Sequence, residues 1–464
     1  MSTRQEGAAS ATVRSKADLT GWIAAGCKPK EKWLIGTEHE KFVFLTDTLG
    51  PVPYEGERGI RALMEAMISR YGWEPIMEGT NIIALKRPEG DLRGPLGGNI
   101  SLEPGGQFEL SGAPVCDIHE TAAETQEHLN EVRDVGEDLG IGFLGLGFSP
   151  KWTLDETPRM PKQRYGVMTR HMPSVGSRGL DMMYRTATIQ VNLDFADEAD
   201  MVKKLRVSLA LQPIATALFA SSPFTEGKPN GFKSLRSEVW RDTDKRRTGM
   251  LPFVFEPGMS FERYADYALD VPMYFVYRDG RYIDVAGASF RKFLEGKLDA
   301  LPGVHPTLDD WSDHLTTLFP EVRMKRFLEM RGADGGRWRR ICALPAFWVG
   351  LLYDQTSLDA AWDLVKDWSV EEREALRNSV PRGAFEAKFR KQTVLDLARE
   401  ALEISEAGLK NRKRLNILGE NEAIYLGPLK ELVAAGKTVA DELLERYEGP
   451  WRRRIDHVFE EIAF

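Results

Sequence analysis

Cysteine is scarce in this chain of 464 residues. Only three cysteines occur, Cys27, Cys116 and Cys342, far apart and without a Cys-x-x-Cys pair. Disulfide-stapled secreted domains and structural zinc sites need more cysteines at closer spacing, so neither class fits. The sequence therefore predicts a protein of a reducing compartment, and we expect a cytosolic (cytoplasmic) location.

Long apolar runs and an excess of basic charge are also missing. The two most apolar stretches, 209–220 and 343–353, are shorter than the about 20 residues that a membrane helix needs, and each contains a proline. Lys and Arg number 62 against 70 Asp and Glu, a net charge of −8. Nucleic-acid-binding proteins usually present a basic patch or stripe, whereas the basic runs here are short and mixed with acids. We expect neither a membrane nor a nucleic acid as a partner.

The N-terminal segment lacks the apolar core of a secretion signal and includes Glu6. We interpret residues 1–15 as a flexible arm in front of a single domain, 16–464. With 42% hydrophobic and 28% charged residues the composition is that of an ordinary globular protein. Residues 351–464 combine dense charge with helical spacing of apolar residues, so this part is predicted to be mainly helical.

Apolar residues alternate in several segments and recur at helical spacing in others. Alternation predicts strands over 33–45, 98–110 and 186–195, the second interrupted by a Pro-Gly-Gly bend. Helical spacing predicts long helices over 118–139 and 199–220. Because the helices fall irregularly between the strands, the pattern favours an α+β fold around a mostly antiparallel sheet over a doubly wound one.

Two carboxylates share one face of the first predicted strand. Glu38 and Glu40 are two residues apart and point to the same side, next to Phe42 and Phe44. Carboxylates beside apolar residues repel each other unless a cation lies between them. Mg²⁺ is the natural cation, because it takes oxygen ligands and bridges to substrate phosphates. The alternative is a solvated strand edge, against which the two phenylalanines argue.

Two further segments carry acids next to glycine-rich turns. Glu103 and Glu109 flank the Pro-Gly-Gly bend, where glycine lets the backbone turn sharply or approach a ligand. Glu329 and Arg331 share a strand face before another Gly-rich turn. There the acid could ligate a metal and the guanidinium could hold a phosphate. In both segments the alternative is a set of solvated side chains at a surface turn.

Two arginines lie beside aromatic residues. Arg164 precedes Tyr165 after a proline turn, and Arg236 lies four residues before Trp240, on one face of a helix. Arg164 could clamp a carboxylate or a phosphate, and Arg236 with Trp240 could form one side of a carboxylate pocket. The alternatives are a solvent-facing cation pair of Lys162 with Arg164 and a stacked surface pair of Arg236 with Trp240.

Common catalytic signatures are absent from the sequence. Residues 436–438 resemble the end of a phosphate-binding loop, but Glu431 stands where the first glycine of such a loop belongs. HExxH and GxSxG do not occur, and the seven histidines do not cluster. The sequence therefore supports neither zinc chemistry nor a serine–histidine triad.

Taken together, these segments resemble the plant-type family of glutamate–cysteine ligases, which also occurs in proteobacteria. The resemblance runs in order through 36–42, 101–112, 160–165, 185–194, 223–231, 240–249, 270–277 and 329–336. It implies a cup-shaped, mainly antiparallel sheet flanked by helices, akin to the catalytic core of glutamine synthetase. It also implies ATP-dependent ligation of the L-glutamate γ-carboxylate to the L-cysteine amine through γ-glutamyl phosphate, the first step of glutathione biosynthesis.

The resemblance assigns roles to the residues singled out above. The metal ligands for Mg²⁺ would be Glu38, Glu40, Glu103, Glu109 and Glu329. Arg331 would stabilise the transferring phosphoryl group, so the expected catalytic residues are Arg331, Glu38 and Glu329. Glutamate would be held by Arg164, Arg236 and Trp240, and Tyr274 would line the cysteine pocket.

Two departures from the plant members carry further expectations. Ala122, Val285 and Ala300 stand where those members have disulfide-forming cysteines, which leaves Cys342 without its partner. The plant members also begin with a plastid transit peptide, for which this chain is too short. Both departures predict a bacterial, cytosolic member without thiol control, and a monomer or weak homodimer. Two alternatives stay open: the same chemistry with another amine acceptor, and a non-catalytic nucleotide-binding scaffold.

Overall fold

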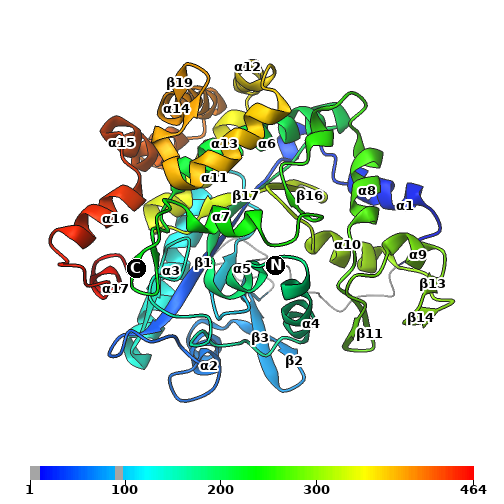
Figure 1. Ribbon diagram of the computed structural model, residues 1–464, viewed down its shortest axis with the longest axis horizontal. Coiled ribbons are helices and arrows are strands. Elements are labelled where there is room, and N and C mark those ends of the chain that lie inside the picture. Colours follow the sequence, from blue (N-terminus) through cyan, green and yellow to red (C-terminus); the bar gives the residue numbers. More distant parts are fainter. Residues whose placement is uncertain (1–10, 89–97) are drawn as a thin grey trace.

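The computed structural model describes residues 11–88 and 98–464. Within these ranges a nine-stranded sheet forms the centre of the molecule (Figure 1). Its strands are β1 (Ile35–Leu45), β2 (Glu74–Glu78), β3 (Asn81–Lys86), β4 (Asn99–Leu102), β5 (Phe108–Ser111), β6 (Ile141–Leu144), β7 (Thr188–Leu193), β16 (Val322–Met324) and β17 (Leu328–Asp334). The order is β16-β17-β7-β1-β5-β4-β3-β2, and β6 pairs with the second half of β1. All of these described pairs are antiparallel, so the predicted α+β class with a mainly antiparallel sheet is confirmed.

Shorter strand pairs lie outside the main sheet. They are β8 (Phe224–Thr225) with β9 (Lys228–Pro229), β10 (Thr248–Gly249) with β15 (Phe319–Pro320), β11 (Phe275–Arg278) with β12 (Arg281–Asp284), β13 (Lys297–Leu298) with β14 (Leu301–Pro302), and β18 (Lys388–Phe389) with β19 (Gln392–Thr393). The β10–β15 pair is parallel and joins two distant parts of the chain beside the main sheet.

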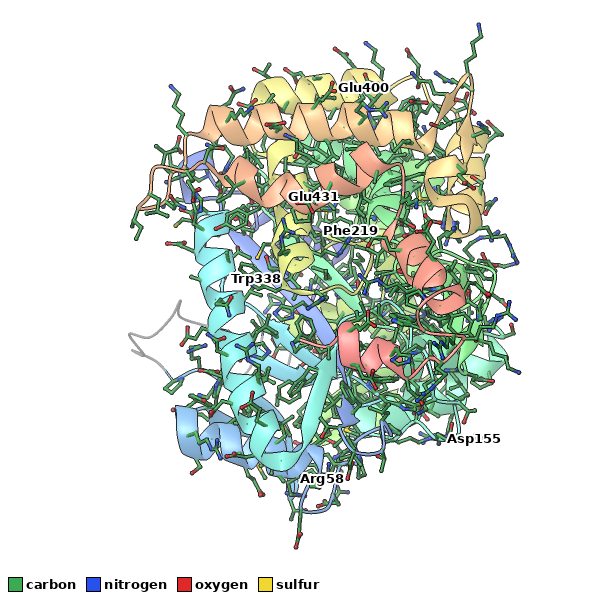
Figure 2. All side chains as sticks on the ribbon, turned by 90° about the vertical axis from the view of Figure 1, so that its left-hand side faces the viewer. Arg58, Asp155, Phe219, Trp338, Glu400 and Glu431 are labelled. Carbon is green, nitrogen blue, oxygen red and sulfur yellow. The ribbon has the colours of Figure 1, made fainter. Side chains whose placement is uncertain are left out.

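Helices surround the sheet. They are α1 (Lys16–Ala24), α2 (Ile60–Tyr71), α3 (Ile118–Leu139), α4 (Gln163–His171), α5 (Gly179–Arg185), α6 (Glu198–Phe219), α7 (Leu235–Arg241), α8 (Phe261–Asp270), α9 (Phe290–Leu294), α10 (Leu308–Thr316), α11 (Trp338–Leu352), α12 (Gln355–Val365), α13 (Val370–Gly383), α14 (Val394–Arg412), α15 (Gly427–Ala435), α16 (Val439–Glu448) and α17 (His457–Glu461). From α12 onward the chain is helical apart from the β18–β19 hairpin and short turns. In Figure 2 Glu400 lies on the outer side of α14, whereas Phe219 of α6 lies deeper in the molecule.

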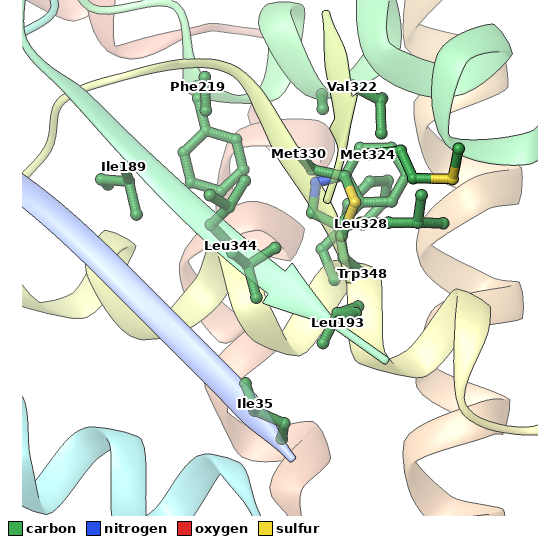
Figure 3. Packing of buried hydrophobic residues seen from close by; sticks show 14 of the residues in the cluster. Ile35, Ile189, Leu193, Phe219, Val322, Met324, Leu328, Met330, Leu344 and Trp348 are labelled. Carbon is green, nitrogen blue, oxygen red and sulfur yellow. The ribbon is translucent and has the colours of Figure 1, made fainter. Parts of the chain in front are cut away.

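The central strand β7 has one polar and one apolar face. Ile189 and Leu193 of β7 are buried on the face opposite to Gln190 and Asn192. Figure 3 shows this apolar face, where side chains of β1, β7, β16 and β17 pack against Phe219 of α6 and against α11. Burying one large apolar side chain stabilises the fold by about 1.5–3 kcal/mol. A shift of the strand pairing by one residue would move every side chain of the strand to the other face. The apolar packing therefore determines which side chains point to the polar face.

Most of the predicted N-terminal arm, residues 1–10, lies outside the described residues. The rest of the arm contacts the start of α10, where Thr12 forms a β-bridge with Thr307. The Val13 amide donates to the Pro306 carbonyl oxygen at 2.8 Å, and the Val13 side chain is buried. Residues 11–15 are therefore held against the domain. Among the described residues, no helix is both long enough and apolar enough to cross a bilayer.

The three cysteines lie in different environments. Cys342 is buried in α11, Cys27 is half-buried and Cys116 is exposed, and all three are free thiols. Burial raises the pKa of the Cys342 thiol to about 12. Because the thiolate is the reactive form, Cys342 is held in an unreactive state.

We predict that the activity of this chain does not respond to dithiothreitol or to mild oxidants. A redox switch needs two sulfur atoms within reach of each other, and Ala122 occupies the position of the partner expected for Cys342. Initial rates and non-reducing gels with and without reductant test this, with Cys116→Ser as a control for cross-linking between chains. A gel shift accompanied by a several-fold change in rate would contradict the prediction.

Candidate active site

The polar face of the sheet carries four of the predicted acids on neighbouring strands. Glu40 of β1 lies opposite Glu109 of β5, and Glu38 lies two residues earlier on β1. Glu329 of β17 lies opposite Asn192 of β7, the strand next to β1. Directly paired residues point to the same face of a sheet, so these acids form one row across four strands.

The bend between β4 and β5 brings the fifth acid, Glu103, to the same region. A Cβ atom on Gly105 would lie 2.3 Å from the Tyr184 carbonyl oxygen, so only glycine permits this close approach. The Gln107 side chain donates from Nε2 to the Thr186 carbonyl oxygen at 2.7 Å. This bond ties the bend to the segment before β7 and holds the buried Glu103 at the edge of the row.

Burial and like charges strongly affect the two acids of β1. Burial, together with the neighbouring Glu329 and Glu109 carboxylates, raises the pKa of Glu38. Burial, together with Glu103 and Glu109, raises the pKa of Glu40 well above its usual value. Neither Glu38 nor Glu40 forms an ion pair with any described residue. The described residues therefore balance the negative charge of these two acids only weakly.

A divalent cation fits this part of the row. Within the described residues Glu38 accepts one hydrogen bond, from Asn192 Nδ2 at 2.8 Å, and Glu40 accepts one, from the Thr188 amide at 3.0 Å. The Oδ1 atom of Asn192 is buried beside Glu38 without a hydrogen-bond partner, as an acceptor prepared for a ligand would be. Among the described side chains, no three His, Cys, Asp or Glu residues form a ready-made metal site. Mg²⁺ typically binds in this way, with one or two carboxylates and the remaining oxygens from water and phosphate.

Glu329, in contrast, is balanced by three cations. Arg323 donates to it from Nε at 3.0 Å and from Nη2 at 2.8 Å, the Lys325 ammonium lies 3.3 Å away, and Arg331 donates from Nη1. Burial alone would raise the pKa of Glu329, but Arg323, Lys325 and Arg331 hold it well below its usual value. Glu329 is therefore a buried, charged anchor for the arginines around it.

A narrow pocket of about 40 Å³, the sheet pocket, opens over the polar face. Its wall includes the predicted site residues Glu40, Glu103, Arg236, Trp240 and Arg331. Residues predicted for metal, glutamate and phosphoryl binding are thus brought together from strands and loops far apart in the sequence. The wall does not include the other predicted site residues, which are Glu38, Glu109, Glu329, Arg164 and Tyr274.

Arg236 and Trp240 present donors without partners at this pocket. Arg236 is only 3% exposed, which excludes a stacked pair on the surface. Its Nη2 atom donates to the Arg331 carbonyl oxygen at 2.8 Å, and its guanidinium lies 5.8 Å from the centre of the Trp240 ring. The Nε atom of Arg236 and the Nε1 atom of Trp240 are buried without a hydrogen-bond partner among the described residues. Two such donors suit an anionic group of a substrate.

Arg164 and Tyr274 lie beside the sheet pocket but not in its wall. The Arg164 guanidinium stacks on Phe275 at 5.0 Å and is buried, so the solvent-facing alternative is excluded. The Tyr274 hydroxyl donates to the Met172 sulfur at 3.6 Å, and its ring packs against the Arg247 guanidinium at 3.8 Å. Tyr274 belongs to the buried cluster against which Trp240 packs, and Arg164 stacks on Phe275 of the same cluster. The Tyr274 side chain is buried and does not line the sheet pocket.

Several residues that shape this site were missed by reasoning from the sequence. They are Gln190, which accepts from Arg331 Nη1 at 2.6 Å, and the cations Arg323 and Lys325. A signal for each was present. Gln190 alternates with apolar residues on a predicted strand, and Arg323 and Lys325 are two residues apart, as Glu38 and Glu40 are.

An antiparallel sheet with a row of acids and with arginines at one pocket is the arrangement expected above for a ligase with a glutamine-synthetase-like core. The model of glutamate–cysteine ligase family 2 matches residues 34–461, and the chain belongs to this family. The predicted family, fold and ligase class are confirmed by the relatives that follow.

Two relatives show how far the similarity extends. The chloroplastic glutamate–cysteine ligase of Nicotiana tabacum is 56% identical over 450 residues, which cover 97% of this chain and 83% of that protein. The corresponding protein of Arabidopsis thaliana is 55% identical, with the same coverage of 97% and 83%. A solved structure of glutamate–cysteine ligase from Francisella tularensis in complex with AMP has a TM-score of 0.54 at 13% identity, covering 92% of this chain and 87% of that one. At that identity the match shows the shared fold.

The expected cytosolic location is wrong on this comparison. The relatives that match 97% of the chain are chloroplastic proteins. A low cysteine count indicates a reducing compartment but does not tell one reducing compartment from another. The associated expectation of a bacterial source has no support among these relatives.

We predict opposite effects on stability for two acids of the row. Glu329→Gln should lower the free energy of unfolding by roughly 3–5 kcal/mol, because Arg323 would be left as a buried cation without its charged partner. Glu38→Gln should leave it unchanged or raise it, because the substitution relieves repulsion between carboxylates. Urea unfolding in metal-free buffer measures both values. Equal losses of stability in the two variants would contradict this account of the charges.

Proposed function

We propose that this chain joins the γ-carboxylate of L-glutamate to the amine of L-cysteine, with ATP as the phosphoryl donor and Mg²⁺ as the metal. One observation carries the proposal: Glu40 of β1, which forms no ion pair with a described residue, meets the side chains of Arg236, Trp240 and Arg331 at one pocket. Phosphorylation of a carboxylate brings two anions together, and such a reaction needs cations on both sides of the transferring group.

Four acids of the polar face and of the bend beside it are the proposed metal site. Glu38, Glu40, Glu103 and Glu109 would hold Mg²⁺, which would supply positive charge to offset the negative charge of the ATP phosphates. Glu329 can join this set only after one of its three cations withdraws, because its oxygens already accept from Arg323, Lys325 and Arg331. In the arrangement described here its role is to position Arg331.

Arg331 and Arg236 are proposed to act on the two reacting anions. The Arg331 guanidinium is held by Glu329 and Gln190 at the pocket wall, where it would stabilise the transferring phosphoryl group. The unpartnered donors of Arg236 and Trp240 would hold glutamate. Because Arg236 is bonded to the Arg331 backbone, the two cationic groups keep a fixed relative position. This arrangement would favour the reactive orientation of both anions, with γ-glutamyl phosphate as the intermediate that the cysteine amine attacks.

The remaining assignments depend on the relatives. Glutamate and cysteine are named as substrates in the names of proteins 55–56% identical to this chain, and AMP is bound in the Francisella tularensis ligase of the same fold. Arg164 and Tyr274 remain proposed contacts to glutamate and cysteine. For that role the buried side chains around Met172 and Phe275 must rearrange, since neither Arg164 nor Tyr274 lines the pocket.

ADP release with a panel of amines tests the function directly. With ATP, Mg²⁺ and glutamate, we expect cysteine to raise the rate of ADP release at least about tenfold over glycine, alanine or lysine, since a site that binds a specific side chain discriminates by such factors. A higher kcat/KM for another amine would replace cysteine as the acceptor. No ADP release with any amine would favour the non-catalytic scaffold.

We also predict that Arg236→Lys raises the KM for glutamate about tenfold or more and changes the KM for ATP far less. A lysine ammonium cannot reproduce the two parallel hydrogen bonds that a guanidinium offers to a carboxylate. Arg170→Lys is a matched control, because Arg170 is on α4 and pairs with Asp284 at the exposed surface. Equal effects of Arg236→Lys on both KM values would move Arg236 to the phosphate side of the site.

A further inference from the structure

A second hollow, the α7 groove, lies at the C-terminal end of α7 and is larger than the sheet pocket. Its volume is about 530 Å³, and it is formed by the end of α7, residues 245–253, α8 and α13. None of its lining residues lines the sheet pocket, so it is a separate site. The proposed reaction uses none of them.

The lining of this groove is predominantly basic. Arg241, Lys245, Arg246 and Arg377 contribute four cations, against the single carboxylate of Glu374. Arg241, Arg246 and Arg377 pair with acids outside the lining, which are Glu238, Asp244 and Glu321. Arg377 also lies 4.0 Å from Glu374 within the lining. Lys245 is exposed and forms no ion pair with any described residue. Such a lining attracts an anion, and clustered arginines suit phosphate in particular.

The aromatic residues of the groove include a hydroxyl without a partner. The rings of Phe253 and Tyr267 lie 5.3 Å apart in the lining. The Tyr267 hydroxyl oxygen is buried and has no hydrogen-bond partner among the described residues. A buried hydroxyl left unpaired destabilises a protein, so this atom points to a polar group supplied by a ligand.

We propose that the α7 groove binds a nucleoside polyphosphate in addition to the one consumed at the sheet pocket. The phosphates would lie on Arg241, Lys245 and Arg246, and the base would pack against Phe253 within hydrogen-bond reach of the Tyr267 hydroxyl. A planar base needs an aromatic or apolar wall, whereas free phosphate would need only the cations. Both kinds of surface are present in the one groove, and its volume is in the range of sites for ligands of this size.

The groove and the sheet pocket share two structural elements. On α7, Trp240 lines the sheet pocket and the next residue, Arg241, lines the groove. In the β10–β15 pair, Thr248 of the groove lies opposite Phe319 of the sheet pocket. A nucleotide in the groove would therefore contact the elements that form the glutamate side of the sheet pocket.

The number of nucleotides bound per chain tests the proposal. Calorimetric titration of the full chain with ADP and Mg²⁺ should give two ADP per chain for the wild type and one for Lys245→Ala/Arg246→Ala. Lys388→Ala/Lys391→Ala is the control, because both lysines are exposed on the β18–β19 hairpin and outside the groove; it should keep two. One ADP per chain in the wild type, or two in the groove variant, would overturn the proposal. A large rise in the KM for ATP in the groove variant, with the number of ADP bound per chain unchanged, would also overturn the proposal. The groove would then hold the ATP that the reaction consumes.

Tyr267→Phe provides a second, independent measurement. Removing an unpaired buried hydroxyl should raise the melting temperature of the nucleotide-free protein by about 1–2 °C. The same change should weaken binding of the second ADP about 3–10-fold, because the ligand loses one hydrogen bond. Unchanged affinity for the second ADP would contradict the assigned position of the base.

Discussion

Repulsion among acids on the polar face of the sheet is the constraint on which the rest of the site depends. Glu38 and Glu40 are buried next to other carboxylates, which raises the pKa of both, and neither pairs with a described cation. The burial of Ile35 and Val43 on the opposite face of β1 keeps them there, since β1 cannot slip by one residue without moving these acids to that buried face. The fold thus maintains an electrostatic cost that a bound cation would remove.

The two ends of the row differ, and this difference separates the proposed tasks. On β16 and β17 the protein supplies its own cations, and Glu329 is fully engaged in holding Arg323 and Arg331. On β1 the carboxylates of Glu38 and Glu40 have no such cations and would be balanced by a bound metal ion. A metal side and an arginine side therefore lie on the same sheet, with the sheet pocket between β1 and α7. This arrangement is suited to transferring a phosphoryl group between two anions.

Local signals in the sequence were sufficient for much of the fold and for the acids. The helix predicted over 118–139 has the same bounds in the structure, because Asp117 caps its first turn and Gly140 ends it in a left-handed conformation. Alternation placed Glu38 and Glu40 on one face, and the Pro-Gly-Gly bend separated β4 from β5. Each of these features depends on residues that are close in the chain.

Contacts between distant segments could not be predicted in the same way. The three cations on Glu329 depend on the β16–β17 hairpin and on the resulting burial of Arg323. The stacking of Arg164 on Phe275 joins two segments that are 111 residues apart in the chain. The packing of Tyr274 against Arg247 joins two segments that are 27 residues apart. No periodic pattern reports such packing. The location was misjudged for another reason, since cysteine content reflects redox conditions and not the identity of a compartment.

The most direct test of the central claim is the thermal stability of the wild type and of Glu38→Gln/Glu40→Gln, each with and without Mg²⁺ and a non-hydrolysable ATP analogue. A ligand that binds the folded state raises stability in proportion to the logarithm of its concentration over Kd. The account predicts that the variant melts at a higher temperature than the wild type without Mg²⁺, and that only the wild type gains stability when Mg²⁺ and the analogue are added. An equal gain in both proteins, or a less stable variant in metal-free buffer, would contradict it.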